Sequence, residues 1–383
     1  MKNYALTDFQ ILRPRHETTQ EKGLEWLAKA HAKTEMTKQP DLDGEQLYQD
    51  FLQRFMHIGC KPEHIHQRGH ELPDFLHHDW PTMEIFRLDQ STFGAGLKQR
   101  QEFHDKATDA IFEKYYPLDS LPPKHLIHVS CTGYSSPSSA QKIVSKRSWG
   151  DQTLVTHAYH MGCYASIPAI RMGGAFVQTE GGQTDIVHTE LCTLHFNPSN
   201  HNPDQIVLQS LFADGYIKYS IKPIIDLQRD KSPYLQVVTS HEELIPTSIE
   251  AMTWTINDWG FEGTLSKKIP FLIARNIRSF IDAIAKNAGT NAETLLNDAL
   301  LAIHPGGPKI LDHIQEILQL SSEQLRFSRK ILQNYGNISS GTLPHMWEAI
   351  SKDESVIGDT LILGLAFGPG LTIAGIILRK KTF

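Results

Sequence analysis

Short apolar runs alternate with longer segments of helical spacing along this chain, and the alternation occurs twice. The apolar run LIHVSCTG at 126–133 ends in a Gly turn and is echoed 174 residues later by LLAIHPGG at 300–307. At the same offset, MGCYAS at 161–166 is echoed by YGNISS at 335–340. Two echoes at one offset indicate an internal duplication of the fold.

Each half is predicted to contain a strand, a Gly turn, a helix, a second helix that starts beside a Gly, and a closing hairpin. A third echo, LFADGYIKYSI at 211–221 against AFGPGLTIAGI at 366–376, follows in the same order at an offset of 155. The first half therefore carries about 19 additional residues, which we expect within 178–205. Strands that alternate with helices predict an α/β fold whose sheets are covered by helices.

Residues 1–120 are more polar than the rest of the chain, and they show helical patterns at 43–57 and 99–116. We interpret residues 1–120 as an N-terminal helical layer together with the start of the first half. Residues 121–225 form the remainder of that half, and residues 226–383 form the second half.

The end of the chain contains 18 residues without a charge, Leu361 to Leu378. This length is near the lower limit for a membrane-spanning helix. Because Gly368-Pro369-Gly370 divides the segment, we predict two buried strands joined by a tight turn. The N-terminal residues contain no apolar stretch of the length that a secretory signal needs, so we expect a soluble, cytoplasmic protein that does not contact a membrane.

The composition is typical of a globular protein with a sizeable core, with 40% hydrophobic and 21% charged residues. The 37 Lys and Arg residues against 43 Asp and Glu give a net charge of −6, which argues against a partner such as nucleic acid or an anionic membrane. The four cysteines are scattered and contain no CxxC pair, which excludes a disulfide framework and a four-cysteine zinc site.

Three residues of the duplicated segments could form a catalytic site: Cys163 in the first half, and His304 and Asn337 in the second. Cys163 stands at the predicted start of a helix, where the helix dipole and unpaired N–H groups lower the pKa of a thiol. His304 ends a strand before Pro-Gly-Gly, at the sheet edge where α/β sites usually lie. Asn337 is the counterpart of Cys163, so these two residues should face each other. A thiol, an imidazole and an amide together fit acyl transfer from a thioester, with two neutral donors for a carbanion.

Each of these residues also has an ordinary structural explanation. Cys163 could be a small buried hydrophobe, His304 could be satisfied by a backbone carbonyl, and Asn337 could be a helix N-cap. Histidines are frequent before residue 80, but their spacing is irregular and no Cys or carboxylate completes a recognised ligand pattern, so we expect no metal site. These histidines are His57, His64, His66, His70, His77 and His78.

The segments GCYASIPAIRM, AIHPGGPKILD and YGNISSGTLPHMWE resemble the three active-site motifs of type III polyketide synthases, the chalcone synthase-like branch of the thiolase-fold condensing enzymes. SCTGYSSPS, FNPS, LFADG and FGPG are similar to further motifs and follow in the family's order. The resemblance covers roughly residues 120–383. It implies a thiolase-like duplicated αβαβα fold of five layers with pseudo-twofold-related halves, a homodimer, and a Cys-His-Asn triad at Cys163, His304 and Asn337.

The resemblance also implies a reaction. An acyl thioester would load Cys163 and be extended by decarboxylative Claisen condensation with a malonyl-thioester, while His304 and Asn337 hold the enolate oxygen. The implied substrates are acyl-CoA and malonyl-CoA, or thioesters of an acyl carrier protein, and no permanently bound cofactor is implied. Alternatives are a single-step enzyme like beta-ketoacyl carrier-protein synthase III, a ketosynthase that joins two acyl chains, or a non-catalytic relative that serves as a subunit. The presence of all three residues argues against the last alternative.

Further cavity residues follow from the resemblance. They are Cys131, Thr132, Ser136, Phe196 and Gly263. Phe196 resembles a gatekeeper phenylalanine, and Arg68 is similar to a basic position that meets coenzyme A phosphates. Gly263 stands where plant members have a second gatekeeper Phe, and Ser136 stands where many members have a Met that reaches across the dimer. We therefore expect a wider, apolar cavity that favours medium or long aliphatic acyl groups.

Overall fold

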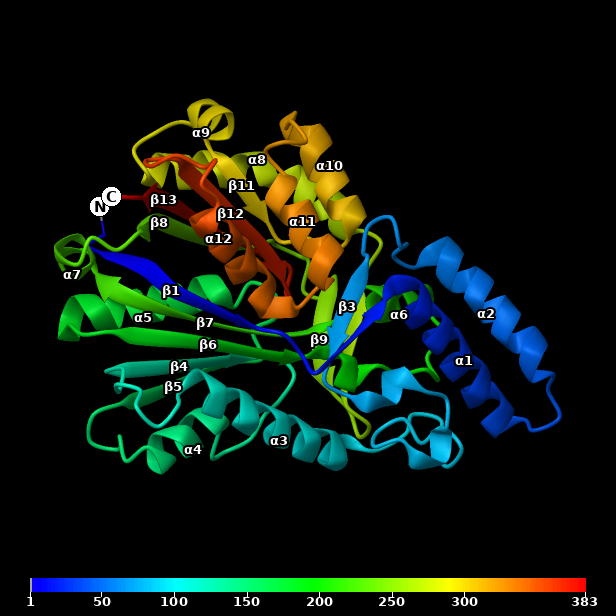
Figure 1. Ribbon diagram of the computed structural model, residues 1–383. Coiled ribbons are helices and arrows are strands. Elements are labelled where there is room, and N and C mark those ends of the chain that lie inside the picture. Colours follow the sequence, from blue (N-terminus) through cyan, green and yellow to red (C-terminus); the bar gives the residue numbers. More distant parts are fainter. Residues whose placement is uncertain (1) are drawn as a thin grey trace.

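The computed structural model describes residues 2–383, and a mixed nine-stranded sheet runs through this part of the chain (Figure 1). In spatial order its strands are β11 (Leu300–Ile303), β12 (Leu361–Gly368), β13 (Thr372–Lys381), β8 (Tyr234–Leu244), β1 (Tyr4–Leu12), β7 (Asp214–Pro223), β6 (Thr184–Leu191), β4 (His125–Ser130) and β5 (Leu154–Tyr159). Two small two-stranded sheets lie outside it. They consist of β2 (His16–Thr19) with β3 (Gln67–His70), and of β9 (Met252–Ile256) with β10 (Phe261–Leu265).

The strand pairing confirms the duplication that the sequence predicts. In the first half, β4 runs parallel to β6, and β6 runs antiparallel to β7. In the second half, β11 runs parallel to β12, and β12 runs antiparallel to β13. The strands β1 and β8 take equivalent places in the two halves. They pair with each other in the middle of the sheet, through Ala5 with Gln236 and Leu6 with Leu235.

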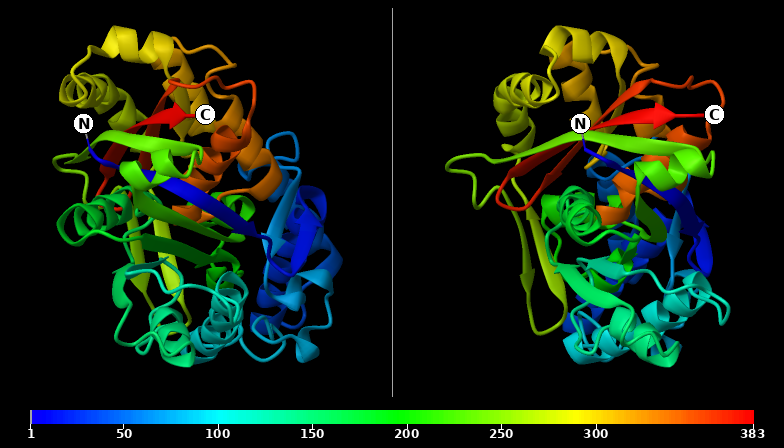
Figure 2. Two further views of the ribbon diagram at one scale, coloured as in Figure 1. Left: turned by 60° about the vertical axis from the view of Figure 1, so that its left-hand side comes forward. Right: turned by 90° about the vertical axis from the view of Figure 1, so that its left-hand side faces the viewer.

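Helices separate and cover the two halves of the sheet. They are α1 (Gln20–Lys38), α2 (Gly44–Ile58), α3 (Leu97–Tyr115), α4 (Ser139–Lys146), α5 (Ser166–Glu180), α6 (Pro203–Leu211), α7 (Ile224–Arg229), α8 (Ile269–Asn287), α9 (Ala292–Asp298), α10 (Pro308–Leu318), α11 (Arg326–Tyr335) and α12 (Thr342–Lys352). Because α5 contacts both β6 and β13, and α12 contacts both β12 and β1, these two helices form a central layer. With α3 and α4 outside the first half and α8 and α10 outside the second, the order is αβαβα (Figure 2). The five-layered thiolase-like fold is therefore confirmed.

The central helix α5 is buried on most of its surface because a half-sheet covers it on either side. Its sequence provides apolar or small residues at nearly every position of the first three turns, from Ile167 to Gly174. A Cβ on Gly174 would lie 2.1 Å from the ring of Tyr4 on β1, so only glycine lets the strand and the helix approach this closely. This packing fixes the middle of α5 against β1, the central strand of the sheet.

The uncharged segment near the C-terminus forms the hairpin β12–β13, which lies within the second half of the sheet. Gly370 turns the chain between the strands with a φ of 99°, in the region that favours glycine. The prediction of two buried strands is confirmed. No helix within residues 2–383 is long and apolar enough to cross a membrane.

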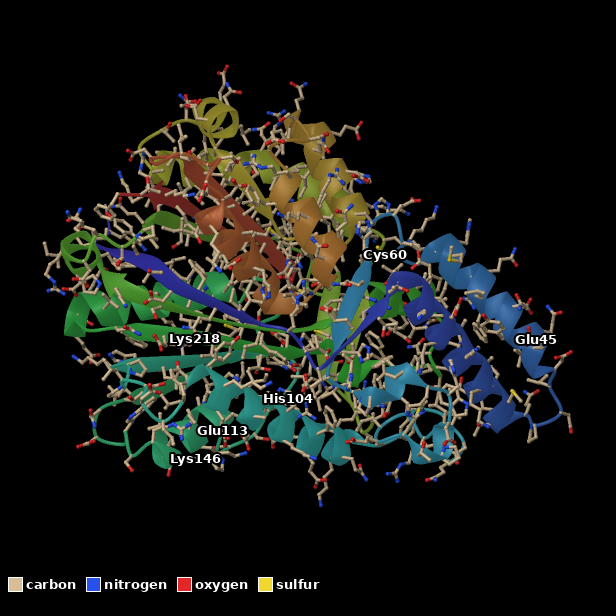
Figure 3. All side chains as sticks on the ribbon, viewed as in Figure 1. Glu45, Cys60, His104, Glu113, Lys146 and Lys218 are labelled. Atoms are coloured by element: carbon tan, nitrogen blue, oxygen red, sulfur yellow. The ribbon has the colours of Figure 1, made fainter. Side chains whose placement is uncertain are left out.

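The N-terminal 120 residues contribute more than a helical layer. The helices α1 and α2 pack side by side and project from one side of the molecule, with α6 against them (Figure 1). The strand β1, by contrast, lies at the centre of the large sheet. On the outer face of the first half, α3 and α4 are linked by an ion pair between Glu113 and Lys146 (Figure 3). The additional residues of the first half form a 3₁₀ turn at Cys192–His195 and then α6, somewhat later than expected.

Candidate active site

A small cavity of about 50 Å³, partly open to solvent, lies where the two halves meet the β9–β10 hairpin. Its wall is mostly apolar and combines residues from widely separated parts of the chain. They are Cys131, Thr132, Gly162, Cys163, Cys192, Leu208, Phe212, Met252, Thr253, Trp254, Gly263, Leu265, Ser339 and Pro369. Of the residues predicted for the site, Cys131, Thr132, Cys163 and Gly263 therefore line one cavity.

Cys163 reaches this cavity from the turn before α5. Gly162 has a φ of 86°, and a Cβ there would lie 2.4 Å from Pro369 Cδ, so glycine is required on both counts. The Cys163 thiol donates to Ser339 Oγ across 3.8 Å. The thiol therefore contacts the segment of the second half that also contains Asn337.

Asn337 is fixed by backbone and side-chain hydrogen bonds. Its N–H donates to the Leu211 carbonyl and its carbonyl accepts from the Ala213 N–H, both across 2.9 Å. Its Oδ1 accepts from the Ser339 N–H across 2.9 Å, which fixes the orientation of the amide and leaves Nδ2 as the donor end. The Asn337–Ser339 turn thus lies against Cys163, as the duplication predicts.

His304 follows β11 and is 1% exposed. Its N–H donates to the Leu365 carbonyl across 2.8 Å, which continues the pairing of β11 with β12. Neither ring nitrogen has a hydrogen-bond partner within residues 2–383, and burial lowers the pKa of His304 to about 3. Buried ring nitrogens normally have partners, so the two free nitrogens of His304 are an exception. Neither His304 nor Asn337 is among the residues that line the cavity.

The resting thiol is neutral. Burial raises the pKa of Cys163 to about 12, and the hydrogen bond to Ser339 only partly offsets this shift. The expectation of a lowered thiol pKa is wrong for two reasons: α5 begins three residues after Cys163, at Ser166, and the apolar cavity disfavours a charge. The buried carboxyl of Glu190 raises the pKa further. With His304 also neutral, no thiolate–imidazolium pair is formed at rest.

Glu190, at the end of β6, is a site residue that the sequence pattern did not reveal. It accepts from the Cys131 N–H across 2.9 Å and from Thr132 Oγ1 across 3.2 Å, and it also accepts from the Ser340 hydroxyl. Burial raises the pKa of Glu190 to about 7, while these donors lower it. A glutamate inside an otherwise buried strand beside Cys192 was the available signal in the sequence.

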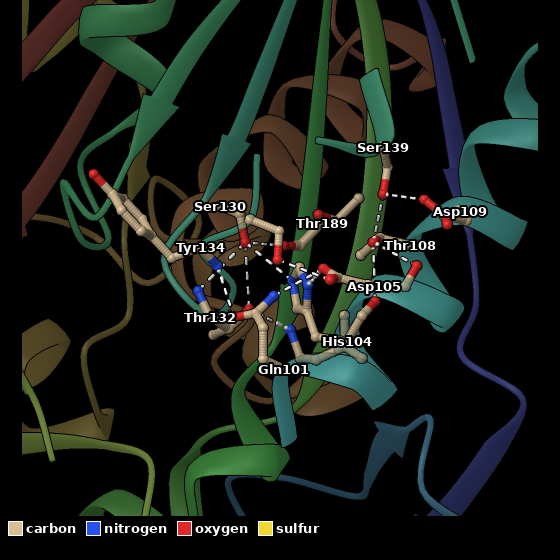
Figure 4. A network of polar contacts seen from close by, with 12 residues as sticks. Gln101, His104, Asp105, Thr108, Asp109, Ser130, Thr132, Tyr134, Ser139 and Thr189 are labelled. Carbon is tan, nitrogen blue, oxygen red and sulfur yellow. Dashed lines mark hydrogen bonds and ion pairs between the residues drawn. The ribbon is translucent and has the colours of Figure 1, made fainter. Parts of the chain in front are cut away.

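The loop that carries Cys131 and Thr132 rests on a second polar network (Figure 4). Ser130 Oγ donates to the Thr189 carbonyl across 2.8 Å and lies 3.4 Å from His104 Nε2. Asp105 follows His104 on α3, and its carboxylate lies 3.5 Å from His104 Nδ1. A Cβ on Gly133 would lie 2.0 Å from the His104 ring, so glycine lets the loop lie flat on this imidazole. Within the described residues, no group of three or more His, Cys, Asp or Glu side chains could hold a metal ion.

Comparisons with known proteins agree with this geometry. Residues 236–382 match the family model of the C-terminal domain of chalcone and stilbene synthases. Type III polyketide synthase C of Arabidopsis thaliana is 28% identical over 299 residues, which cover 74% of this chain and 76% of the plant protein. The chain is a relative of the type III polyketide synthases.

Solved structures share the fold over nearly the whole chain. PKS-I from the brown alga Ectocarpus siliculosus has a TM-score of 0.82 at 22% identity and covers 99% of this chain, with 98% of its own chain matched. 1,3,6,8-Tetrahydroxynaphthalene synthase from Streptomyces coelicolor A3(2), a bacterial type III polyketide synthase, has a TM-score of 0.77 at 21% identity, with 99% and 100% of the two chains covered. At these identities the likeness establishes the fold.

In this relative of the type III polyketide synthases, Trp254 takes the space beside Gly263. A Cβ on Gly263 would lie 2.7 Å from Leu208 Cδ1 and 3.0 Å from Trp254 Cε3. Trp254 Nε1 donates to the Cys131 carbonyl across 2.7 Å, which holds the indole in the cavity wall. The expectation of a wider cavity is therefore wrong, because a side chain from the paired strand fills the space, although the lining is apolar as expected.

Arg68 does not present its charge to the surface. The side chain is buried, and its guanidinium donates to Gln20 Oε1 and to the carbonyls of Gln209 and Phe212 across 2.7 to 2.8 Å. The Nε and Nη1 donors of Arg68 are thus used inside the fold, where the residue joins α1 to α6. Because the side chain is buried, this conformation does not support the expected contact of Arg68 with coenzyme A.

Phe196 and Ser136 also lie outside the lining of the Cys163 cavity. Phe196 is buried edge-to-face against Phe75, with ring centroids 6.0 Å apart, and it lines a separate small pocket with Arg68. Ser136 is exposed on the loop after Cys131. In this conformation neither residue shapes the space around the thiol, so the expectation that Ser136 widens it is not supported.

Proposed function

We propose that the chain is a condensing acyltransferase, which loads an acyl thioester on Cys163 and extends it by decarboxylative Claisen condensation with a malonyl-thioester. Acyl-CoA and malonyl-CoA are the proposed substrates, with carrier-protein thioesters as the alternative donors, and the residues of the chain need no bound cofactor for this chemistry. The observation that carries the proposal is the Cys163 thiol, which opens into an apolar cavity and contacts the turn that orients the Asn337 amide.

Loading exchanges one thioester for another. The carbonyl–sulfur bond of the donor breaks, a new thioester forms at Cys163, and the thiol proton ends on the released thiol. Because the resting thiol is neutral, this proton must be removed as the acyl group arrives. We assign its transfer to His304, whose ring nitrogens have no partner within residues 2–383.

Extension requires donors for a developing negative charge. When the malonyl-thioester loses carbon dioxide, the electron pair of the broken carbon–carbon bond forms an enolate, whose oxygen we place between His304 and Asn337 Nδ2. The lowered pKa of His304 keeps the imidazole neutral, so that it donates without becoming a competing acid. The enolate carbon then attacks the acyl carbonyl, and the Cys163 sulfur leaves and takes up a proton.

Replacing either donor should slow decarboxylation. His304→Ala or Asn337→Ala is expected to lower the release of carbon dioxide from malonyl-CoA by on the order of 10²-fold or more, the usual scale for the loss of one oxyanion donor. Labelled carbon dioxide measures the rate, and Asn334→Ala, which changes a partly exposed asparagine on α11, is the control. Normal release from both variants would exclude the assigned roles.

Product analysis tests the proposal as a whole. The protein is incubated with malonyl-CoA and saturated acyl-CoA or acyl carrier-protein donors of two to twelve carbons, and mass spectrometry follows products and the Cys163 peptide. We expect an acyl adduct on Cys163 and products lengthened by two-carbon units. Products with a single added unit would instead indicate an enzyme like beta-ketoacyl carrier-protein synthase III. Absence of both adduct and product from every donor would reject a condensing activity.

We also propose that the chain forms a homodimer along β5. This strand is the edge of the large sheet, and an open edge pairs readily with another strand. Exposed apolar side chains lie beside it, with Leu154 57% and Tyr134 63% exposed. Sedimentation should therefore give twice the mass of one chain, and Leu154→Lys should shift the protein toward a monomer. A parent protein that is monomeric at micromolar concentration would contradict this proposal.

A further inference from the structure

The β9–β10 hairpin follows β8 in the second half but is bonded to the first half (Figures 1 and 2). At its tip, the Leu97 N–H at the start of α3 donates to the Asp258 carbonyl across 2.8 Å. In its middle, His160 Nε2 donates to the Trp254 carbonyl across 2.9 Å. The hairpin of the second half is therefore fixed to the first half both at its tip and in its middle.

One buried imidazole connects this hairpin to the Cys131–Thr132 loop. The Phe261 N–H donates to His195 Nδ1 across 3.0 Å, so the ring proton is on Nε2, which donates to the Thr132 carbonyl across 2.8 Å. The ring of His195 also stacks on Phe261, with centroids 4.4 Å apart and planes 5° from parallel. A backbone group on each side is thus satisfied by the same side chain.

His195 has no nitrogen left for chemistry. It is 4% exposed, and both ring nitrogens are used by backbone partners. Burial lowers its pKa to about 3, and the nearby charges of Arg100, His104 and His160 lower it as well, whereas the bond to Thr132 raises it. The imidazole is therefore neutral at physiological pH and remains a two-sided connector.

The connection determines where Trp254 lies. The indole packs edge-to-face on His195, with centroids 5.8 Å apart and planes 89° apart. Its Nε1 donates to the Cys131 carbonyl, so Trp254 and His195 attach the hairpin to two consecutive carbonyls of the loop. Trp254 and Gly263 of this hairpin line the cavity that contains Cys163.

We propose that His195 is a positioning residue that sets the length of acyl chain that the cavity admits, because it holds the hairpin and Trp254 against the Cys131–Thr132 loop. This inference rests on the proposed function for its substrate class. The part of the inference that concerns structure, namely that His195 fixes the hairpin, does not depend on the chain having enzymatic activity. The proposal places a specificity determinant in a residue that lines no part of the cavity itself.

The test uses His195→Phe, which keeps a ring that can stack on Phe261 but removes both hydrogen bonds. Single-turnover loading of Cys163 is measured with acyl-CoA donors of two to twelve carbons. We expect loading with the two-carbon donor to stay within about twofold of the parent, while donors of eight to twelve carbons gain about tenfold or more. Burial of one further methylene corresponds to about fourfold in affinity, so two additional methylenes account for this gain. Hydrogen exchange of the peptide 252–265 should also become faster, since the Phe261 N–H loses its acceptor.

Two variants and one control make the outcome decisive. His195→Gln can still donate to the Thr132 carbonyl and should restore much of the parent length profile. Gly260→Ala places a Cβ 3.2 Å from His195 Nδ1 and therefore disturbs the same contact from the hairpin side. This variant provides the test if His195→Phe does not fold. His31→Phe changes a buried, twice-bonded histidine in α1 and should leave the length profile unchanged.

An unchanged length profile and unchanged exchange in a folded His195→Phe or Gly260→Ala variant would overturn the inference. The same change of profile in His31→Phe would overturn it too, because any loss of a buried histidine would then be sufficient. A parent protein that never acylates Cys163 would refute the proposed function. The hydrogen-exchange measurement needs no substrate, so it would still show whether His195 fixes the hairpin.

Discussion

Cys163→Ala is expected to lose acyl loading by on the order of 10⁴-fold or more, the scale seen when an enzyme loses its only nucleophile. The cavity contains two other thiols, but neither is placed to replace it. Cys131 accepts a hydrogen bond from the Gly162 N–H through its sulfur, across 3.0 Å, and burial with the nearby Glu190 carboxyl raises the pKa of Cys131 well above its usual value. Burial raises the pKa of Cys192 in the same way.

Peptide mapping after incubation with an acyl thioester measures this effect directly. Cys60→Ala is the matched control, because Cys60 is buried in a small cluster near β3 (Figure 3) and is not among the residues that line the cavity. The control should acylate as the parent does, with the added mass on the Cys163 peptide. An acyl adduct on Cys131 with Cys163 unmodified would show that the nucleophile is assigned wrongly.

This protein is expected to unfold in acid at a higher pH than it would if only its carboxylates bound protons. Burial holds the pKa of six histidines at about 3 to about 4, below their usual 6.5. These are His31, His70, His188, His195, His304 and His345. As the pH falls below 6.5 the unfolded chain binds protons on these residues and the folded chain does not, so stability is lost progressively toward pH 3.

Two buried carboxyl groups act in the opposite direction. Burial raises the pKa of Glu190 and Asp214 to about 7, so the folded chain binds these two protons first and gains stability as the pH falls from 7 toward 4. Each group changes the free energy of unfolding by about 1 kcal/mol between pH 6.5 and 5.5, so six histidines against two carboxyls leave a net loss of about 4 kcal/mol. This loss is a large part of the stability of an ordinary domain.

Urea unfolding at pH 7.5, 6.5 and 5.5 measures this dependence. His188→Gln removes one buried imidazole and should make the pH dependence shallower, whereas His313→Gln changes an exposed histidine and should leave it unchanged. Equal free energies of unfolding at pH 7.5 and 5.5 would contradict the prediction.

The duplicated fold could be predicted because its repeated glycines satisfy a local backbone requirement. Gly162 and Gly336 stand at equivalent places before Cys163 and Asn337, and both have a positive φ, of 86° and 70°. Residues with a Cβ rarely adopt this conformation, so the same turn needs glycine in both halves and leaves a visible echo. The pairing of Cys163 with the Asn337 segment could be inferred for the same reason.

Other features of the site depend on residues that are distant in sequence. The pKa of Cys163 is set by burial among side chains from both halves, which no local motif reports. The space beside Gly263 is filled by Trp254 from the neighbouring strand, so a small residue in the sequence did not mean an open cavity. The expected role of Arg68 in binding coenzyme A follows from its local motif alone. Its hydrogen-bond acceptors, however, include the carbonyl of Gln209, 141 residues away.

The position of β1 has a consequence for how the chain reaches its structure. The partners of this strand, β7 and β8, are synthesised about 200 residues after it. At roughly 5 to 20 residues per second, the ribosome takes about ten seconds or more to supply those partners. Throughout that interval the apolar residues Tyr4, Ala5 and Leu6 have no strand beside them. The first half therefore cannot complete its sheet until β7, its last strand, has been synthesised, and β1 gains its second neighbour only when β8 follows. Until then the nascent chain must avoid aggregation through these apolar residues.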